Sequence, residues 1–173
     1  RIQKRLTLII PLTIFIIFFF HYMAFNSVVK SLMVMLSVPF ALIGGLWFLL
    51  LYNFHFSVAV GVGFIALAGV AIETAIVMVI FLDEAYERHL KEGKMKTVQD
   101  LENAIHEGAV QRVRPKLMTV CVGIAGLLPI MWSQGTGADV MQRIAAPMIG
   151  GLITSTILVL VIIPIIYFLW RKR

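Results

Sequence analysis

Five long apolar stretches, separated by short polar segments, dominate the hydrophobic pattern of this chain. They cover residues 6–25, 32–52, 56–82, 115–132 and 144–170. A helix needs about 20 predominantly apolar residues to cross the hydrocarbon core of a bilayer. The pattern therefore predicts an all-α membrane protein, built as a bundle of five transmembrane helices.

The longest polar segment, residues 83–114, separates the third stretch from the fourth. Thr97 and Asp100 have the spacing of a capping box, which marks the start of a helix. Apolar residues then recur at helical intervals: Val98, Leu101, Ile105 and Ala109. We expect a short interfacial helix on the inner membrane surface, although a connector helix packed on the bundle fits the same pattern. Pro115 is expected to mark the first turn of the fourth span or a kink.

The composition agrees with a membrane protein and argues against a nucleic-acid partner. Hydrophobic residues make up 60% of the 173, whereas a soluble domain has about 45–50%. The net charge is +6, but the basic residues flank the apolar stretches, as they do in proteins anchored in a lipid bilayer. The single cysteine, Cys121, excludes an internal disulfide. Because the chain starts at Arg1 and almost at once becomes apolar, we interpret it as a fragment, a C-terminal portion or a trimmed chain.

The distribution of lysine and arginine predicts how the spans are oriented. One set of span ends carries eleven basic residues and the other carries four. Basic residues are enriched on the cytoplasmic side of membrane proteins. We therefore expect a periplasmic N-terminus and a cytoplasmic C-terminus, although the basic cluster within residues 1–5 opposes this rule.

One carboxylate, Glu73, interrupts the third apolar stretch, which has no other charge. Placing an ionisable side chain at that depth costs roughly 2.5 kcal/mol or more, and such groups usually face a bundle interior or a wet cavity. Gly69, one turn earlier, clears space on the same helical face. We interpret Glu73 as a proton-coupling group of a transporter; the alternative is a static carboxylate bonded to a neighbouring helix.

Lys116 and Thr119 stand three residues apart at the start of the fourth stretch, hence on one helical face. Lys116 either extends to the cytoplasmic interface or pairs with a buried carboxylate. Three acidic residues at the end of the third stretch are expected to be solvated: Asp83, Glu84 and Glu87.

Methionine is the residue type that points to a metal. The chain has nine, and thioethers suit soft ions such as Cu(I) and Ag(I), but each methionine alone is an ordinary core filler. Met141 differs because it lies just inside the turn GTGADVMQR, with Met131 across the same loop. The four histidines lack metal-ligand spacing, and no catalytic constellation is visible, so we do not expect an enzyme.

Three stretches of the sequence resemble the heavy-metal efflux pumps of the RND superfamily. They are GVAIETAIVMVIFL, then HEGAVQRVRPKLMTV followed by IAGLLPIMW, and finally VMQRIAAPMIGGLITSTILVLVIIP. The resemblance covers essentially the whole chain, as the C-terminal five spans of a twelve-span transporter. The glutamate at position 73 is most like the branch of that family that exports Cu(I) and Ag(I).

The resemblance implies a proton-driven homotrimer in the bacterial inner membrane, joined to a periplasmic adaptor and an outer-membrane channel. It implies no resident cofactor; Cu(I) or Ag(I) and protons are transported. Glu73 and Lys116 would occupy positions of a proton relay whose aspartate partner lies in the missing N-terminal half. Met141 would be one methionine of a pair on the metal path, and Thr119 a polar position used by drug-exporting relatives.

Two alternatives to a metal pump stay open. One is a relative that exports organic compounds, although such pumps are expected to have a lysine at position 73. The other is a non-transporting membrane scaffold left by truncation, whose role would not depend on Glu73. The expected depths of Glu73 and Lys116 in the membrane also differ, which argues against direct contact between them. Glu73 lies nine residues from the end of its span, or roughly 13 Å at about 1.5 Å per residue, whereas Lys116 is expected near the rim. We therefore do not predict a direct salt bridge.

Overall fold

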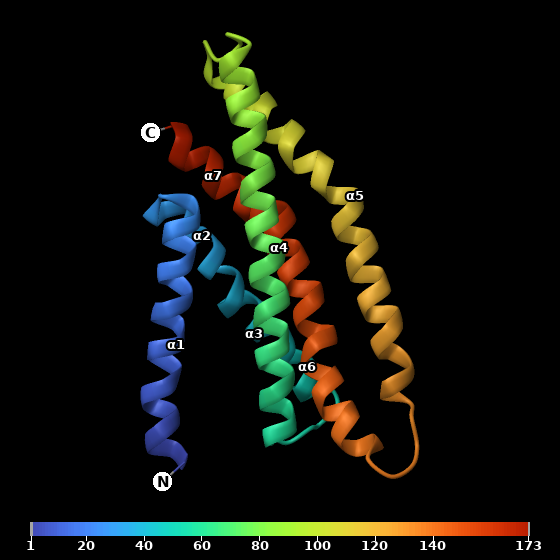
Figure 1. The fold of residues 1–173 in the computed structure, drawn as a ribbon. Coiled ribbons are helices and arrows are strands. Elements are labelled where there is room, and N and C mark those ends of the chain that lie inside the picture. The colour runs from blue at the N-terminus through green and yellow to red at the C-terminus, as the bar shows by residue number, and fades with distance from the viewer. Residues whose placement is uncertain (1, 173) are drawn as a thin grey trace.

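The computed structural model describes residues 2–172, and the regular elements within that range are all helical (Figure 1). They are α1 (Ile2–Phe25), α2 (Val28–Met35), α3 (Ser37–Leu51), α4 (Val58–Lys91), α5 (Val98–Met131), α6 (Ala138–Ile157), the π-helical segment η1 (Leu158–Ile162) and α7 (Ile163–Lys172). They form five stretches long and apolar enough to cross a membrane, as predicted. The basic ends Arg1 and Arg173 lie outside the described residues.

Side-chain caps explain where three of the helices begin. Ser27 and Ser57 precede α2 and α4, and each hydroxyl accepts a hydrogen bond from the backbone N–H three residues later. Thr97 and Asp100 form the capping box predicted at the start of α5, with both reciprocal hydrogen bonds present. Such caps satisfy backbone donors that a helix end leaves without partners.

Prolines account for the interruptions in the second and fifth spans. A proline removes one backbone donor and crowds the carbonyl four residues before it. For Pro39 that carbonyl belongs to Met35, the last residue of α2, and the span resumes as α3 after Leu36. For Pro164 it belongs to Leu160, inside η1. A local π-helical adjustment of this kind accommodates proline in a membrane helix.

The fourth span differs from the sequence expectation. The stretch expected to form a separate interfacial helix is the first part of α5, which runs without a break through Pro115. The reason is packing: Leu101, Ala104 and Gly108 are buried against the end of α4, which itself continues to Lys91. Together α4 and α5 form a long antiparallel hairpin, and the end of the bundle at its turn is called here the hairpin end. The C-terminus lies there, and the N-terminus lies at the opposite end (Figure 1).

Small residues set the closest helix contacts. A Cβ atom on Gly44 of α3 would lie 2.5 Å from the carbonyl oxygen of Gly150 in α6, and one on Gly150 would lie 2.3 Å from that of Gly44. A Cβ atom on Gly108 of α5 would lie 2.9 Å from the carbonyl oxygen of Phe81 in α4. These helices therefore meet backbone to backbone, a common device in membrane bundles.

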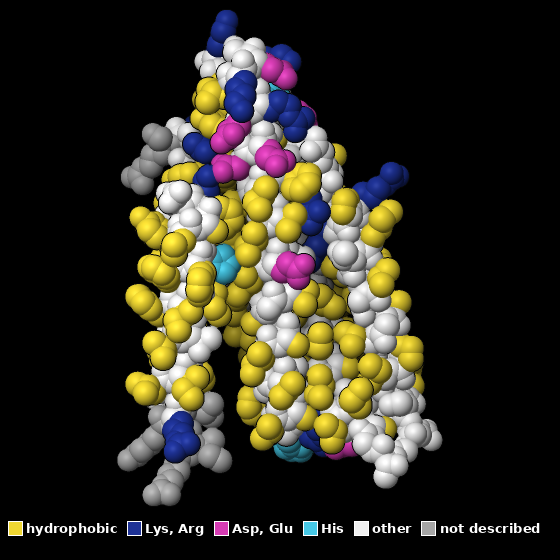
Figure 2. All heavy atoms as spheres, viewed as in Figure 1, with side chains coloured by type: hydrophobic (Ala, Val, Ile, Leu, Met, Phe, Trp, Pro, Cys, Tyr) yellow, Lys and Arg dark blue, Asp and Glu magenta, His cyan; other side chains and the backbone are white. Residues whose placement is uncertain are grey.

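Helix α1 stands apart from the rest of the bundle. It packs mainly on α2, and its apolar side chains, such as Leu8 and Phe15, are largely exposed. Figure 2 shows an open space between the lower part of this helix and the bundle. The apolar surface of α1 is therefore available to lipid or to further protein.

The contact at Gly108 predicts a difference between two glycine substitutions in one helix. Gly108→Ala should destabilise the chain by about 1–3 kcal/mol, because the new methyl group meets the α4 backbone. Gly126→Ala, whose Cβ atom would meet nothing within 4 Å, should be neutral or stabilise by up to about 1 kcal/mol. Thermal unfolding of the chain in detergent micelles measures both. Equal effects would contradict the close α4–α5 contact.

Candidate functional site

Helix α4 carries Glu73 on a face that the other helices do not cover. The buried residues of α4 include Leu67, Ala71 and Ala75, whereas Glu73 is exposed within this chain. Gly69, one turn away, has open space beside it, as the sequence predicted. Figure 2 shows one acidic side chain isolated within the hydrophobic surface, with basic atoms next to it. The carboxylate is thus accessible from outside this chain at membrane depth.

Lys116 lies deeper than its expected position at the membrane rim. It is only 2% exposed, on the face of α5 that packs against α4. Glu73 lies eighteen residues before the last residue of α4, and Lys116 lies eighteen residues after the first residue of α5. The two side chains therefore stand at one level of the hairpin, about 27 Å from its turn at about 1.5 Å per residue.

The register of the hairpin confirms that level. The backbone of Gly108 lies against Leu82, where a Cβ atom would be 3.2 Å from the Leu82 Cα. Eight residues further along α5 is Lys116, and eight residues back along the antiparallel α4 is Thr74, the neighbour of Glu73. The close glycine contact thus determines which residues of the two helices face one another.

Glu73 and Lys116 stand at one level of the hairpin without forming an ion pair. Arg112, one helical turn before Lys116, carries a second positive charge near that level. Within the part of the chain that the structure describes, no ion pair of 4 Å or less includes either Glu73 or Lys116. Arg112 itself lies over the ring of Phe81, 5.1 Å from its centroid. The Glu73 and Lys116 side chains therefore lie at one level of the hairpin without a direct ion pair.

The hydroxyl of Thr119 forms hydrogen bonds only to the backbone of its own helix. The Oγ1 atom donates to the backbone carbonyl of Lys116 at 2.9 Å and of Pro115 at 3.1 Å. Its side chain lines a shallow cavity between α4, α5 and α6, together with Val70 and Met148. No described contact joins Thr119 to Glu73.

The two methionines at the 131–141 loop have different surroundings. Met141, in the first turn of α6, is 51% exposed, whereas Met131 is buried in an apolar cluster with Leu49 and Ala145. Met131 is therefore core, and Met141 offers a free thioether at the surface. Among the described residues, no group of three or more His, Cys, Asp or Glu side chains could hold a metal ion.

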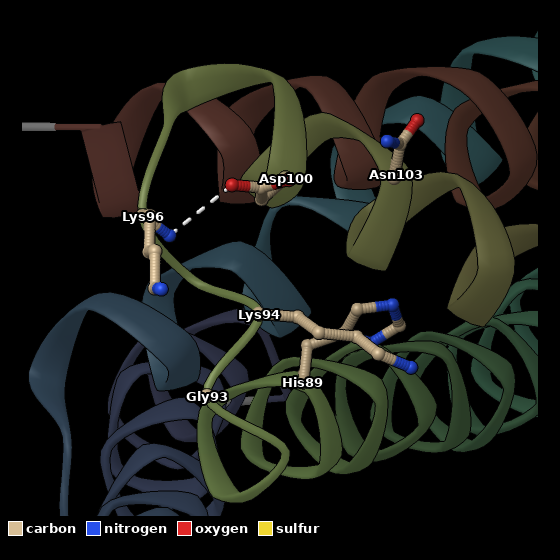
Figure 3. A pocket seen from close by; sticks show the side chains of 6 residues that line it. All are labelled: His89, Gly93, Lys94, Lys96, Asp100 and Asn103. Carbon is tan, nitrogen blue, oxygen red and sulfur yellow. Dashed lines mark hydrogen bonds between the residues drawn. The ribbon is translucent and has the colours of Figure 1, made fainter.

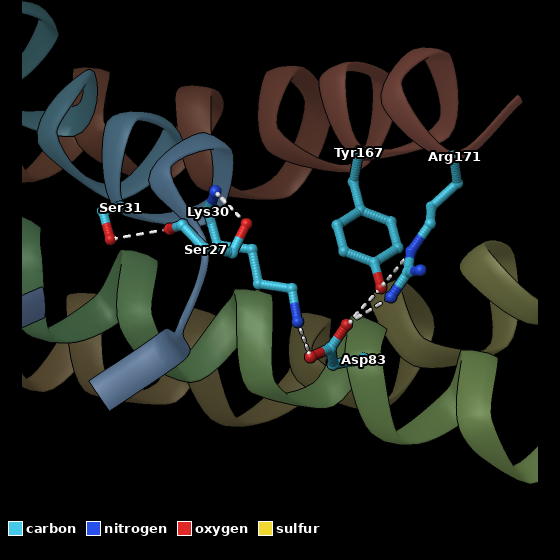
Figure 4. A network of polar contacts seen from close by, with 6 residues as sticks. All are labelled: Ser27, Lys30, Ser31, Asp83, Tyr167 and Arg171. Carbon is cyan, nitrogen blue, oxygen red and sulfur yellow. Dashed lines mark hydrogen bonds and ion pairs between the residues drawn. The ribbon is translucent and has the colours of Figure 1, made fainter. Parts of the chain in front are cut away.

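A polar network at the hairpin end was not expected from the sequence (Figure 4). Asp83 of α4 accepts hydrogen bonds from Lys30 of α2 and from the hydroxyl of Tyr167 in α7, and it pairs with Arg171 at 3.2 Å. The expectation that Asp83 is solvated is therefore wrong, whereas Glu84 and Glu87 are exposed. The network joins three helices that are distant in sequence.

Two signals in the sequence could have indicated this network. Lys30 is the only lysine or arginine between Arg5 and Arg88, so no other fixed positive charge lies within or between the first three spans. Tyr167 and Arg171 are four residues apart on one face of the last helix. Lys30 and the Tyr167–Arg171 face are expected on the same side of the membrane. An acidic residue at that level, such as Asp83, could therefore have been predicted to bind both.

Comparison with known proteins gives consistent results. The profile of the AcrB/AcrD/AcrF family matches residues 1–171. The chain is 53% identical to the putative cation efflux system protein SilA of Salmonella typhimurium, over 99% of this chain and 17% of that protein. It is 52% identical to the cation efflux system protein CusA of Escherichia coli K12, over 100% of this chain and 17% of that protein. The chain thus spans about a sixth of the length of these relatives.

A solved structure supports the same relationship. The crystal structure of a heavy metal efflux pump matches with a TM-score of 0.82 and 37% identity, covering 99% of this chain and 16% of that one. The helical arrangement described above is therefore that of one segment of a much longer transporter.

The Asp83 network predicts a large loss of stability on Asp83→Asn. The change leaves Lys30 and Arg171 without their counter-charge, and we expect a cost of about 2–4 kcal/mol, near that of breaking a buried ion pair. Asp139→Asn is the matched control, because its pair with Arg143 is a surface i,i+4 contact worth under about 1 kcal/mol. Chemical unfolding in micelles compares the two; a smaller loss for Asp83→Asn than for the control would contradict the network.

Proposed function

The chain belongs to the AcrB/AcrD/AcrF family, and on that basis we propose that it is the C-terminal membrane part of a proton-driven pump that exports Cu(I) and Ag(I). The observation that carries the proposal is the placement of Glu73 and Lys116 at one level, with the carboxylate facing out of the chain. The relatives named as cation efflux proteins support a cation as the cargo. The glutamate at position 73 supports the monovalent branch.

The two charges provide a means of coupling proton binding to a change in helix packing. When Glu73 is ionised, its negative charge would offset the positive charge of the buried Lys116 at the same level of the hairpin. A proton that binds Glu73 removes that counter-charge, so the preferred packing of α5 against α4 changes. Each proton that crosses inward gains about 2.3 kcal/mol per 100 mV of membrane potential. We infer that this energy drives alternation of the α4–α5 hairpin between two packings.

The uncovered face of α4 is where the rest of the pump completes the relay. An acidic residue of the missing N-terminal half would approach Glu73 beside Gly69, where this chain leaves open space. Thr119 would join the relay through the cavity that it lines between α4 and α6. Among the described residues, Glu73 forms no ion pair that such a partner would have to displace.

Met141 serves the metal path in this proposal. Its half-exposed thioether is a soft ligand that suits Cu(I) and Ag(I), and a second methionine from the missing half would share the ion. The whole pump would be a homotrimer in the inner membrane, with a periplasmic adaptor and an outer-membrane channel. The excess of basic residues at the hairpin end supports a cytoplasmic C-terminus and a periplasmic N-terminus.

The coupling role predicts that Glu73→Gln abolishes metal tolerance in cells that rely on this protein, because the neutral amide cannot bind and release a proton. Growth on silver and copper measures tolerance, and immunoblotting of membranes should show an unchanged protein level. Glu87→Gln, an exposed change on the same helix, should leave tolerance intact. Normal growth of the Glu73→Gln strain would refute the coupling role and favour a non-transporting scaffold.

The metal path predicts a selective effect of Met141→Ile. Losing the thioether should lower tolerance to Cu(I) and Ag(I) several-fold, because isoleucine keeps the apolar volume but offers no ligand. Met118→Ile is the matched control, since Met118 is similarly exposed on α5. Uptake of a fluorescent organic substrate gives the second readout. An equal loss of metal and organic-compound export would indicate an exporter of organic compounds or a folding defect.

A further inference from the structure

A basic pocket lies at the hairpin end, between the last turn of α7 and the start of α5. It has a volume of about 270 Å³, and its basic and aromatic wall consists of Tyr86, Lys96, Arg171 and Lys172. Val98 and Leu101 form an apolar wall. None of its lining residues is acidic.

The positive charge of this pocket is largely uncompensated. Arg171 is held by Asp83 and lies over the ring of Tyr86, 4.0 Å from its centroid. In the described part of the chain, neither Lys96 nor Lys172 forms an ion pair. The N-terminal end of α5 lies on the same side, but the Asp100 carboxylate already caps it and is not counted in this surplus. The pocket therefore has a surplus of positive charge and no internal anion.

A neighbouring pocket on the other side of the α4–α5 turn lacks this surplus (Figure 3). It is lined by His89, Lys94 and Asp100, and it shares Lys96 with the basic pocket. The Lys94 ammonium already pairs with Glu92 at 2.6 Å, and Asp100 supplies a negative charge. Figure 3 shows the side chains of His89 and Lys94 close together, whereas that of Lys96 points away from them.

An exposed apolar stripe leads from the basic pocket along the last span. Its residues recur every four positions: Ile153, Ile157, Val161, Ile165 and Leu169, each between 46% and 60% exposed. Lys172 follows Leu169 by three residues, so the stripe ends at the basic pocket. Trp170 lies at the same level, as aromatic residues do where a bilayer meets water. The basic pocket, which could bind a phosphate group, is thus adjacent to an apolar surface that could contact an acyl chain.

We propose that this pocket binds the headgroup of an anionic phospholipid. Lys96 and Lys172 contact the phosphate, and one acyl chain lies along the stripe of α6, η1 and α7. Basic pockets between transmembrane helices recognise such headgroups elsewhere. The stripe favours a lipid over free phosphate, because inorganic phosphate has no apolar part that could cover this surface.

Native mass spectrometry of the intact protein in mild detergent tests this binding. Titration with phosphatidylglycerol should give a saturable bound lipid that phosphatidylcholine does not replace. Lys96→Gln combined with Lys172→Gln should weaken the affinity about 30-fold at low salt, since each lysine near a lipid surface contributes about fivefold. Both side chains are exposed, so melting temperatures of the variant and the parent should agree.

The matched control is Lys91→Gln combined with Lys94→Gln, which removes the same charge from the hairpin end but outside the pocket. It should change the affinity less than threefold. An equal loss in both double variants would overturn the pocket in favour of diffuse attraction. Absence of any preference for the anionic lipid would overturn the proposal outright, and displacement of the lipid by inorganic phosphate would assign the pocket to free phosphate instead.

Discussion

A buried lysine beside an intramembrane carboxylate is the arrangement on which the rest of this structure depends. Lys116 is almost entirely removed from solvent, and such a charge is tolerated only where an opposite charge is near. The register of the α4–α5 hairpin supplies Glu73 at that level, and the backbone contact at Gly108 fixes the register. The continuity of α5 through Pro115 is therefore a requirement of the site, since a break there would move Lys116 away from Glu73.

Two groups of charges in this bundle differ in how fully they are paired. Asp83 makes contacts with Lys30, Tyr167 and Arg171, so its network is saturated and ties α2, α4 and α7 together. Glu73 and Lys116 are near one another but not joined. A saturated network resists change, whereas an incompletely paired carboxylate responds to a proton or to a third group. The first arrangement suits a structural clamp and the second suits coupling.

The hydropathy pattern predicted the five spans, because apolar length alone decides whether a helix can cross a bilayer. The capping box at Thr97 was also predicted, because its geometry is local. The depth of Lys116 was not predicted. Pro115 has the sequence features of a helix start, and only tertiary packing keeps α5 continuous through it. The role of Asp83 was missed because its partners come from segments far apart in the sequence. Glu73, Thr119 and Met141 stay candidates named from the sequence, because the partners that a relay or a metal path would need are proposed to lie outside this chain.

A double-mutant cycle on Glu73 and Lys116 tests the central claim most directly. The free energy of unfolding of the intact protein in bicelles would be measured for the parent, Glu73→Gln, Lys116→Met and the combined variant. Residues coupled through their charges show interaction energies of about 0.5–3 kcal/mol, so the loss from Lys116→Met should be larger when Glu73 is present than when it is replaced. Additive effects, within about 0.5 kcal/mol, would contradict the coupling from which the proposed mechanism starts.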